Sequence, residues 1–185
     1  VFTAAGERWA ELVDVELSAG DEAMRGVAAA VHARGGAVIV SSHDFAATPS
    51  REEMDHMKAL LREGMDSGCF GMTTGLIYPP GVYSSAEELI ELAQVLKETG
   101  GLYFSHMRNE SAFLLDSVRD TINIGRQAGI PVQISHHKAL GRDNWGLVTE
   151  SLRMVDEART QGVDVTIDQY PYTSCSTSVR ACLPP

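Results

Sequence analysis

The sequence predicts an α/β fold, a segment of a TIM-like (β/α)8 barrel with about five βα units in view. Four polar residues end successive apolar runs at nearly regular intervals: Thr74, His106, His136 and Asp168 are separated by 32, 30 and 32 residues. Each interval fits one strand, one helix and their two loops. A doubly wound sheet stays open as an alternative, but polar residues at several strand ends favour a barrel over a single switch point.

The chain begins with a stretch that carries little periodicity. We expect residues 1–20 to be an irregular or short helical lead-in, and residues 21–185 to form the partial barrel domain. Apolar positions at helical spacing over 21–34 predict the first helix of that domain, and a glycine pair ends it. The uninterrupted apolar run 37–40 then predicts a strand of a parallel sheet that is covered on both faces.

Two serine-glutamate pairs mark the starts of the next helices. Ser50 and Glu53 form a capping box, which opens a helix that runs to the glycine at position 68. Ser85 and Glu88 form another, which opens a helix over residues 85–97. The remaining elements alternate in order: strand 69–76 between these helices, then strand 102–106, helix 111–128, strand 131–136, helix 146–161 and strand 163–168.

Composition excludes several classes of partner. The formal net charge of −10 and the absence of a Lys or Arg cluster argue against nucleic acid, which is bound through basic patches. No apolar run approaches the roughly 18 residues of a membrane span. The acidic charge leaves a small-molecule substrate as the expectation. The three cysteines are odd in number and form no C-x-x-C pair, so we expect a reducing cytoplasmic location. Five strands of an eight-stranded barrel also leave open edges, which predict self-association.

The paired histidines carry the strongest chemical signal. His106 and His136 each end an apolar run in Ser-His, so both should leave neighbouring strands at the same level. A single such histidine is more often a satisfied rim residue, but equivalent placement of two favours a metal site of a metal-dependent hydrolase. Catalytic zinc takes about three protein ligands, so the pair alone does not complete a site. His137 should point to the opposite side of its strand and serve packing or hydrogen bonding.

Four motifs then identify a family. They are GMTTGLIYPPG at 71–81, HMRNE at 106–110, ISHHK at 134–138 and DQYPY at 168–172. Together they resemble the N-acyl-D-amino-acid deacylases, or D-aminoacylases, of the amidohydrolase superfamily, over roughly residues 51–185. The resemblance implies a metal-bearing barrel that hydrolyses the amide bond between an acyl group and a D-amino acid.

The resemblance also implies roles for particular residues. It makes His106 and His136 zinc ligands. It places Lys138 at the α-carboxylate of the substrate, where its ammonium would act as a point charge. The hydroxyl groups of Tyr170 and Ser176 match positions that hold the same carboxylate.

One further position concerns the reacting bond. Tyr78 matches a position near the scissile amide. Taken singly, a tyrosine before a proline more often packs, so the combination of motifs supports this assignment more than any member does.

Three features of the family are missing from this sequence. They are the His-x-His pair that opens such barrels, the cysteine ligand that follows it, and the aspartate that takes a proton from the activated water. Cys69 and Asp168 lie in other motifs and do not replace them. We therefore expect no catalytic residue within this chain and no activity from it in isolation.

Two other readings stay open. A related cyclic amidase or dihydroorotase-like hydrolase would share histidine ligands at strand ends, because a fold does not fix a function. A non-catalytic barrel remnant could bind small carboxylated ligands or a partner. We also interpret Arg108 and Glu110 as an ion pair that holds the loop after His106.

Overall fold

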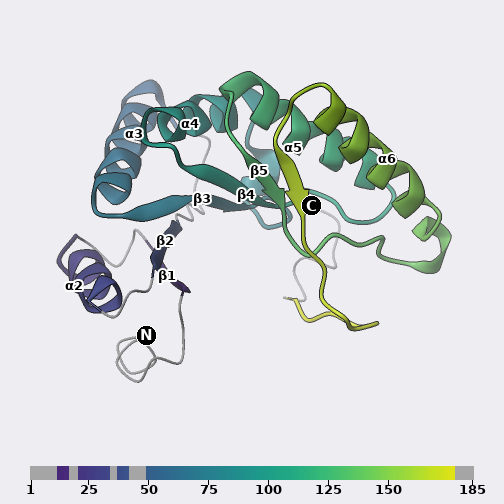
Figure 1. The fold of residues 1–185 in the computed structure, drawn as a ribbon, viewed down its shortest axis with the longest axis horizontal. Helices are drawn as coiled ribbons and strands as arrows, with labels where there is room; N and C mark the ends of the chain where they lie inside the picture. Colours follow the sequence, from purple (N-terminus) through teal and green to yellow (C-terminus); the bar gives the residue numbers. More distant parts are fainter. Residues whose placement is uncertain (1–11, 17–20, 34–36, 42–48, 178–185) are drawn as a thin grey trace.

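A computed structural model describes residues 12–16, 21–33, 37–41 and 49–177 of the chain. These residues form six strands and five α-helices, which alternate along the sequence (Figure 1). The strands are β1 (Leu12–Glu16), β2 (Ala37–Ser41), β3 (Cys69–Gly75), β4 (Leu102–His106), β5 (Val132–Ile134) and β6 (Val165–Ile167). The helices are α2 (Asp21–His32), α3 (Arg51–Asp66), α4 (Ala86–Thr99), α5 (Leu114–Ala128) and α6 (Leu147–Thr160), with short 3-10 turns η2 (Gly81–Tyr83) and η3 (Arg142–Asn144).

The strands form one parallel sheet in the order of the sequence, from β1 to β6. Helices α3 to α6 follow one another along one side of this sheet, each against the next (Figure 1). A doubly wound sheet would reverse its strand order at a switch point, and this sheet does not. The predicted barrel segment is therefore confirmed, with β1 and β6 at the two edges of the described sheet.

The lead-in differs from the expectation of an irregular or short helical stretch. Residues Leu12–Glu16 form β1, which pairs in parallel with β2 from Leu12 opposite Ala37 to Glu16 opposite Ser41. Apolar and acidic residues alternate from Val13 to Glu16, a pattern that suits a strand but is too short to exclude a helix from the sequence alone. The sheet thus begins before residue 21, whereas Trp9 and Leu17 of the expected helix lie outside the described residues.

The capping signals in the sequence correspond to observed helix starts. The Ser50 hydroxyl accepts a hydrogen bond from the Glu53 backbone N–H, and the Glu53 carboxylate accepts one from the Ser50 backbone N–H. The Ser85 hydroxyl accepts from the Glu88 N–H in the same way at the start of α4. Both caps satisfy amide groups that have no partner within the first helical turn.

The core lies between the helices and the sheet. Tyr103, Leu96, Leu114 and Ile134 are almost completely buried there, and the Tyr103 hydroxyl lies 2.5 Å from Thr74 Oγ1 on the next strand. None of the helices among the described residues is long and apolar enough to cross a bilayer.

Strand register aligns the carboxyl ends of β3, β4 and β5. Gly75 pairs with His106, and Ser105 pairs with Ile134. The register is regular from β3 onward, but it shifts between β2 and β3, where Val38 pairs with Cys69 and Val40 with Met72. The aligned ends of β4 and β5 place the two predicted histidine ligands beside each other.

Candidate metal centre

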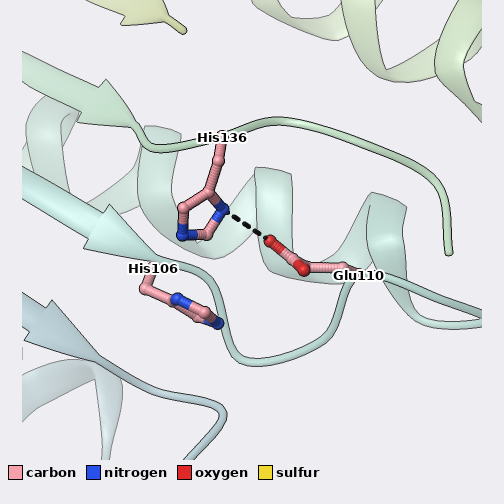
Figure 2. A group of neighbouring side chains, drawn as sticks. All are labelled: His106, Glu110 and His136. Atoms are coloured by element: carbon pink, nitrogen blue, oxygen red, sulfur yellow. Dashed lines mark ion pairs between the residues drawn. The ribbon is translucent and has the colours of Figure 1, made fainter. Parts of the chain in front are cut away.

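The structure brings the two predicted histidines together. His106 is the last residue of β4 and His136 follows β5 by two residues, and their ring centroids are 4.4 Å apart at an interplanar angle of 76°. Figure 2 shows the rings edge to face, with the His136 ring reaching toward the end of β4. The expectation that both side chains leave neighbouring strands on one side is confirmed by this geometry.

A third side chain, which sequence reasoning did not place in the site, completes the cluster. Glu110 lies in the loop after β4, and its Oε1 is 3.0 Å from Nδ1 of His136 (Figure 2). One ligand atom from each of His106, Glu110 and His136 lies within 4.8 Å of the others. Two imidazoles and a carboxylate are a donor set that zinc accepts in catalytic sites.

The interpretation of Arg108 and Glu110 as an ion pair is wrong. The Arg108 guanidinium donates instead to the backbone carbonyls of Gly81, Val82 and Ser84, around the turn η2. Its five donors in a planar fork suit several carbonyl groups at once. Arg108 thus ties the loop after β4 to the loop after β3, and Glu110 is left to face the histidines.

The loop that carries Glu110 has its own internal support. Asn109 Oδ1 accepts hydrogen bonds from the backbone N–H groups of Ser111 and Phe113, and the Asn109 N–H donates to Ser117 Oγ on α5. A side-chain oxygen that accepts from amides two and four residues ahead fixes a turn before a helix. The Glu110 side chain is consequently presented from a defined backbone and is only 6% exposed.

His136 has an unusual backbone conformation. Its φ of 40° lies in the left-handed region, which non-glycine residues rarely occupy. The His136 N–H donates to Asp168 Oδ1 at 2.6 Å, and Gln133 Nε2 donates to Asp168 Oδ2 at 2.7 Å. Asp168, which directly follows β6, therefore holds the backbone that carries the His136 ring. A strained backbone conformation persists only where the surrounding structure fixes it.

The pKa of His106 favours the neutral form of its ring. Burial lowers the pKa of His106 to about 4, while Glu110 opposes this effect and His136 and Lys138 add to it. His106 Nε2 is buried and has no hydrogen-bond partner among the described residues. At neutral pH this imidazole is thus uncharged, which is the form that binds metal.

The Glu110 carboxyl has opposing influences on its pKa. Burial alone raises it, but hydrogen bonds from His136 and Lys138 and the charge of Lys138 together bring it below the usual value. The group is therefore an ionised carboxylate at neutral pH, next to His136 and Lys138.

The residues predicted to bind substrate lie around the same pocket. It has a volume of about 550 Å³ and opens beside the histidines. Lys138 Nζ lies 5.4 Å from the centre of the Tyr170 ring. The pocket lining includes five of the six predicted site residues, namely His106, His136, Lys138, Tyr170 and Ser176.

Tyr78, the sixth, lies next to this lining. Its ring centroid is 5.3 Å from that of His106, and its hydroxyl is 3.0 Å from Thr177 Oγ1. The loop after β3 thereby meets the segment after β6 across the strand ends. Tyr78 therefore lies beside His106, and its place near a reacting amide stays a prediction.

Two other residues are separate from the cluster. His137 is buried and its Nε2 lies 2.9 Å from Ser151 Oγ on α6, which confirms the expected packing and hydrogen-bonding position. Cys69 begins β3, at the opposite end of that strand from Gly75, and burial raises the pKa of its thiol to about 11. A buried thiol at the amino end of β3 lies away from the carboxyl ends that carry the histidines, so Cys69 does not supply the cysteine ligand of the family.

Comparison with known proteins shows similarity to deacylases along nearly the whole chain. D-aminoacylase from Alcaligenes xylosoxydans xylosoxydans is 36% identical over 174 residues, which cover 94% of this chain and 35% of that protein. A D-aminoacylase structure from a study of its binuclear metal centre superposes with a TM-score of 0.73 at 31% identity, over 80% of this chain and 34% of that one. N-acyl-D-glutamate deacylase from Bordetella bronchiseptica, solved with zinc and a phosphonate inhibitor, gives 0.72 at 34% identity, over 80% and 34%.

A second similarity concerns the first part of the chain. The model of the type I 3-dehydroquinase family matches residues 2–69. The 3-dehydroquinate dehydratase of Methanosarcina barkeri (strain Fusaro / DSM 804) is 50% identical over 58 residues, which are 31% of this chain and 23% of that protein. The family-model match ends at residue 69, before His106, Glu110 and His136 in the sequence. The chain spans about a third of the D-aminoacylase that it resembles.

Proposed function

We propose, from the membership of this chain in the N-acyl-D-amino-acid deacylase family of amidohydrolases, that the protein containing it hydrolyses the amide bond of N-acyl-D-amino acids. The observation that carries the proposal is the convergence of two kinds of residue on one pocket. Candidate metal ligands, His106 and His136, and a candidate carboxylate-binding pair, Lys138 and Tyr170, line it together.

Zinc is the metal we propose for the site. His106 and His136 would hold it, and the buried, unpartnered Nε2 of His106 supports that assignment. A zinc ion supplies a Lewis acid that polarises an amide carbonyl and lowers the pKa of water. The family's general-base aspartate and its remaining ligands match no residue of this chain, so we propose that the rest of the protein supplies them and that the 185-residue chain alone is inactive.

The chain's own residues would bind and orient the substrate. Lys138 would attract the α-carboxylate, and the Tyr170 and Ser176 hydroxyls would donate hydrogen bonds to it. The position of Tyr170 beside Lys138 in the same pocket supports this. Tyr78 would pack beside the scissile amide, next to His106.

The first prediction is the reaction itself. The complete protein, loaded with zinc, should release free amino acid from N-acetyl-D-amino acids and act on the L-enantiomers at least about 100-fold more slowly, because mirror-image substrates misplace one group at a fixed site. Chiral chromatography of the products measures both rates. Turnover of cyclic amides alone would support the cyclic amidase reading, and no turnover of either class would support the non-catalytic remnant.

The second prediction concerns the chain in isolation. The strands β1 and β6 are the edges of the sheet that the described residues form, and an edge strand can pair with another copy through its backbone groups. Light scattering should therefore report dimers or larger species for the 185-residue chain. A monodisperse monomer that unfolds cooperatively on heating would contradict this, and would mean that the sheet edges are covered.

We also propose a cytoplasmic location for the protein. Cys69 and Cys175 are free thiols in the described part of the chain, and free thiols suit a reducing compartment.

A further inference from the structure

We propose that Glu110 is a positioning residue, which keeps the proton of His136 on Nδ1 and so leaves Nε2 available to the metal. Lys138 competes with Glu110 for the contact with Nδ1 and favours the opposite tautomer. The inference deepens the proposed function and rests on it only for the presence of a metal. It assigns Glu110 a place behind His136, not a place among the metal ligands.

The contacts of Glu110 support this placement. Its Oε1 lies 3.0 Å from His136 Nδ1 and 2.5 Å from Lys138 Nζ, and the side chain is 6% exposed. Its backbone carbonyl also accepts a hydrogen bond from the Leu140 N–H at 2.6 Å. Glu110 is therefore tied to the segment after β5 through both its side chain and its main chain.

His136 Nδ1 has two polar neighbours of opposite character. The Glu110 carboxylate can only accept a hydrogen bond, whereas the Lys138 ammonium, 2.9 Å from Nδ1, can only donate one. A neutral imidazole carries one proton, so each neighbour favours a different tautomer. The two contacts cannot both be satisfied by the same neutral ring.

The consequence for the metal differs between the two tautomers. When Nδ1–H donates to Glu110, Nε2 keeps its lone pair and can bind a cation. When Nδ1 accepts from Lys138, Nε2 carries the proton and cannot bind. Histidines that ligate metals commonly donate their other N–H to a carboxylate, which fixes the ring and its tautomer.

Lys138 has hydrogen-bond acceptors other than His136 Nδ1. Its Nζ donates to Glu110 Oε1 and, at 2.8 Å, to the His136 carbonyl oxygen. With Glu110 present, these two acceptors hold the ammonium, so that Lys138 does not need His136 Nδ1 as an acceptor. Without Glu110, Lys138 would be the polar group that remains beside Nδ1 among the described residues. The proton of the neutral ring would then move to Nε2, which is the tautomer that cannot bind the metal through Nε2.

A double-mutant cycle in zinc affinity tests this proposal. The apo form of the complete protein is titrated with zinc against a chelator, for wild type, Glu110→Gln, Glu110→Ala, Lys138→Met and the double variant Glu110→Ala with Lys138→Met. Glutamine keeps an acceptor at Nδ1, so Glu110→Gln should stay within about threefold of wild type, whereas Glu110→Ala should lose about 10-fold to 100-fold. Lys138→Met should raise the zinc affinity more in the Glu110→Ala background than in wild type, because it removes the donor that competes for Nδ1.

Each other outcome overturns the proposal. Equal losses in Glu110→Gln and Glu110→Ala would make Glu110 a direct metal ligand. Unchanged zinc affinity in Glu110→Ala would mean that Glu110 has no part in the metal site. Additive effects of the two substitutions would mean that Lys138 acts on the cation only through its charge. Because no substrate is used, the result does not depend on whether the protein hydrolyses N-acyl-D-amino acids.

Discussion

Replacement of His106 or His136 with alanine should lower the zinc affinity of the complete protein more than about 100-fold, beyond the loss typical of a residue behind a ligand. Each histidine supplies one of the few nitrogen donors in the cluster, and their rings lie 4.4 Å apart with no other imidazole of the described residues in the group. Turnover should disappear with the metal. Zinc content after dialysis, measured by atomic emission, gives the readout.

His56 offers a matched control for these substitutions. It lies exposed on α3, far along the chain from the cluster, so His56→Ala removes an imidazole without removing a donor from the site. We expect zinc content and turnover of that variant to equal those of wild type. Undiminished zinc in both His106→Ala and His136→Ala would remove the two histidines from the metal site.

The second large effect is expected at Lys138. Lys138→Met should reduce kcat/KM for N-acyl-D-amino acids by about tenfold to 100-fold, equivalent to about 1.5–3 kcal/mol for a lost charged hydrogen bond. The corresponding amides, which lack the α-carboxylate, should be affected much less. Steady-state kinetics on the two substrate classes measures the difference, and Lys97→Met, an exposed lysine near the end of α4, is the control.

The comparison of substrates separates recognition from stability. Lys138→Met leaves the buried Glu110 carboxylate without its cationic partner, which destabilises a protein. Such a loss would lower the activity toward both substrate classes alike. Equal losses on both would therefore mean that Lys138 supports structure and does not recognise the carboxylate.

The sequence predicted the parts of this site that lie on regular elements. The interval between His106 and His136 placed both at strand ends, since a βα unit has a nearly constant length. Glu110 was misassigned because it lies in a loop, where spacing does not indicate direction. Its neighbour Arg108 offered a plausible partner in sequence, but the guanidinium satisfies three carbonyls around η2 instead.

The strand β1 was missed for a different reason. Its five residues, Leu12–Glu16, are too few to distinguish a period of two from a helical period when neighbouring apolar residues also fit a helix. The backbone conformation of His136 was likewise beyond reach, because it depends on Asp168, which is 32 residues away in the sequence.

The register of the sheet shifts between β2 and β3, near the point where one of the two sequence similarities ends. The match to type I 3-dehydroquinases ends at residue 69, and Cys69 is the first residue of β3, where the regular pairing also breaks. Parallel strands are joined by backbone hydrogen bonds, which do not depend on side-chain identity. Across this seam, α3 and α4 are joined by ion pairs of Glu91 with Arg51 and Lys58. Cys69 therefore marks a junction in the chain. Backbone pairing and ion pairs join the elements on its two sides, and His106 and His136 both lie after it.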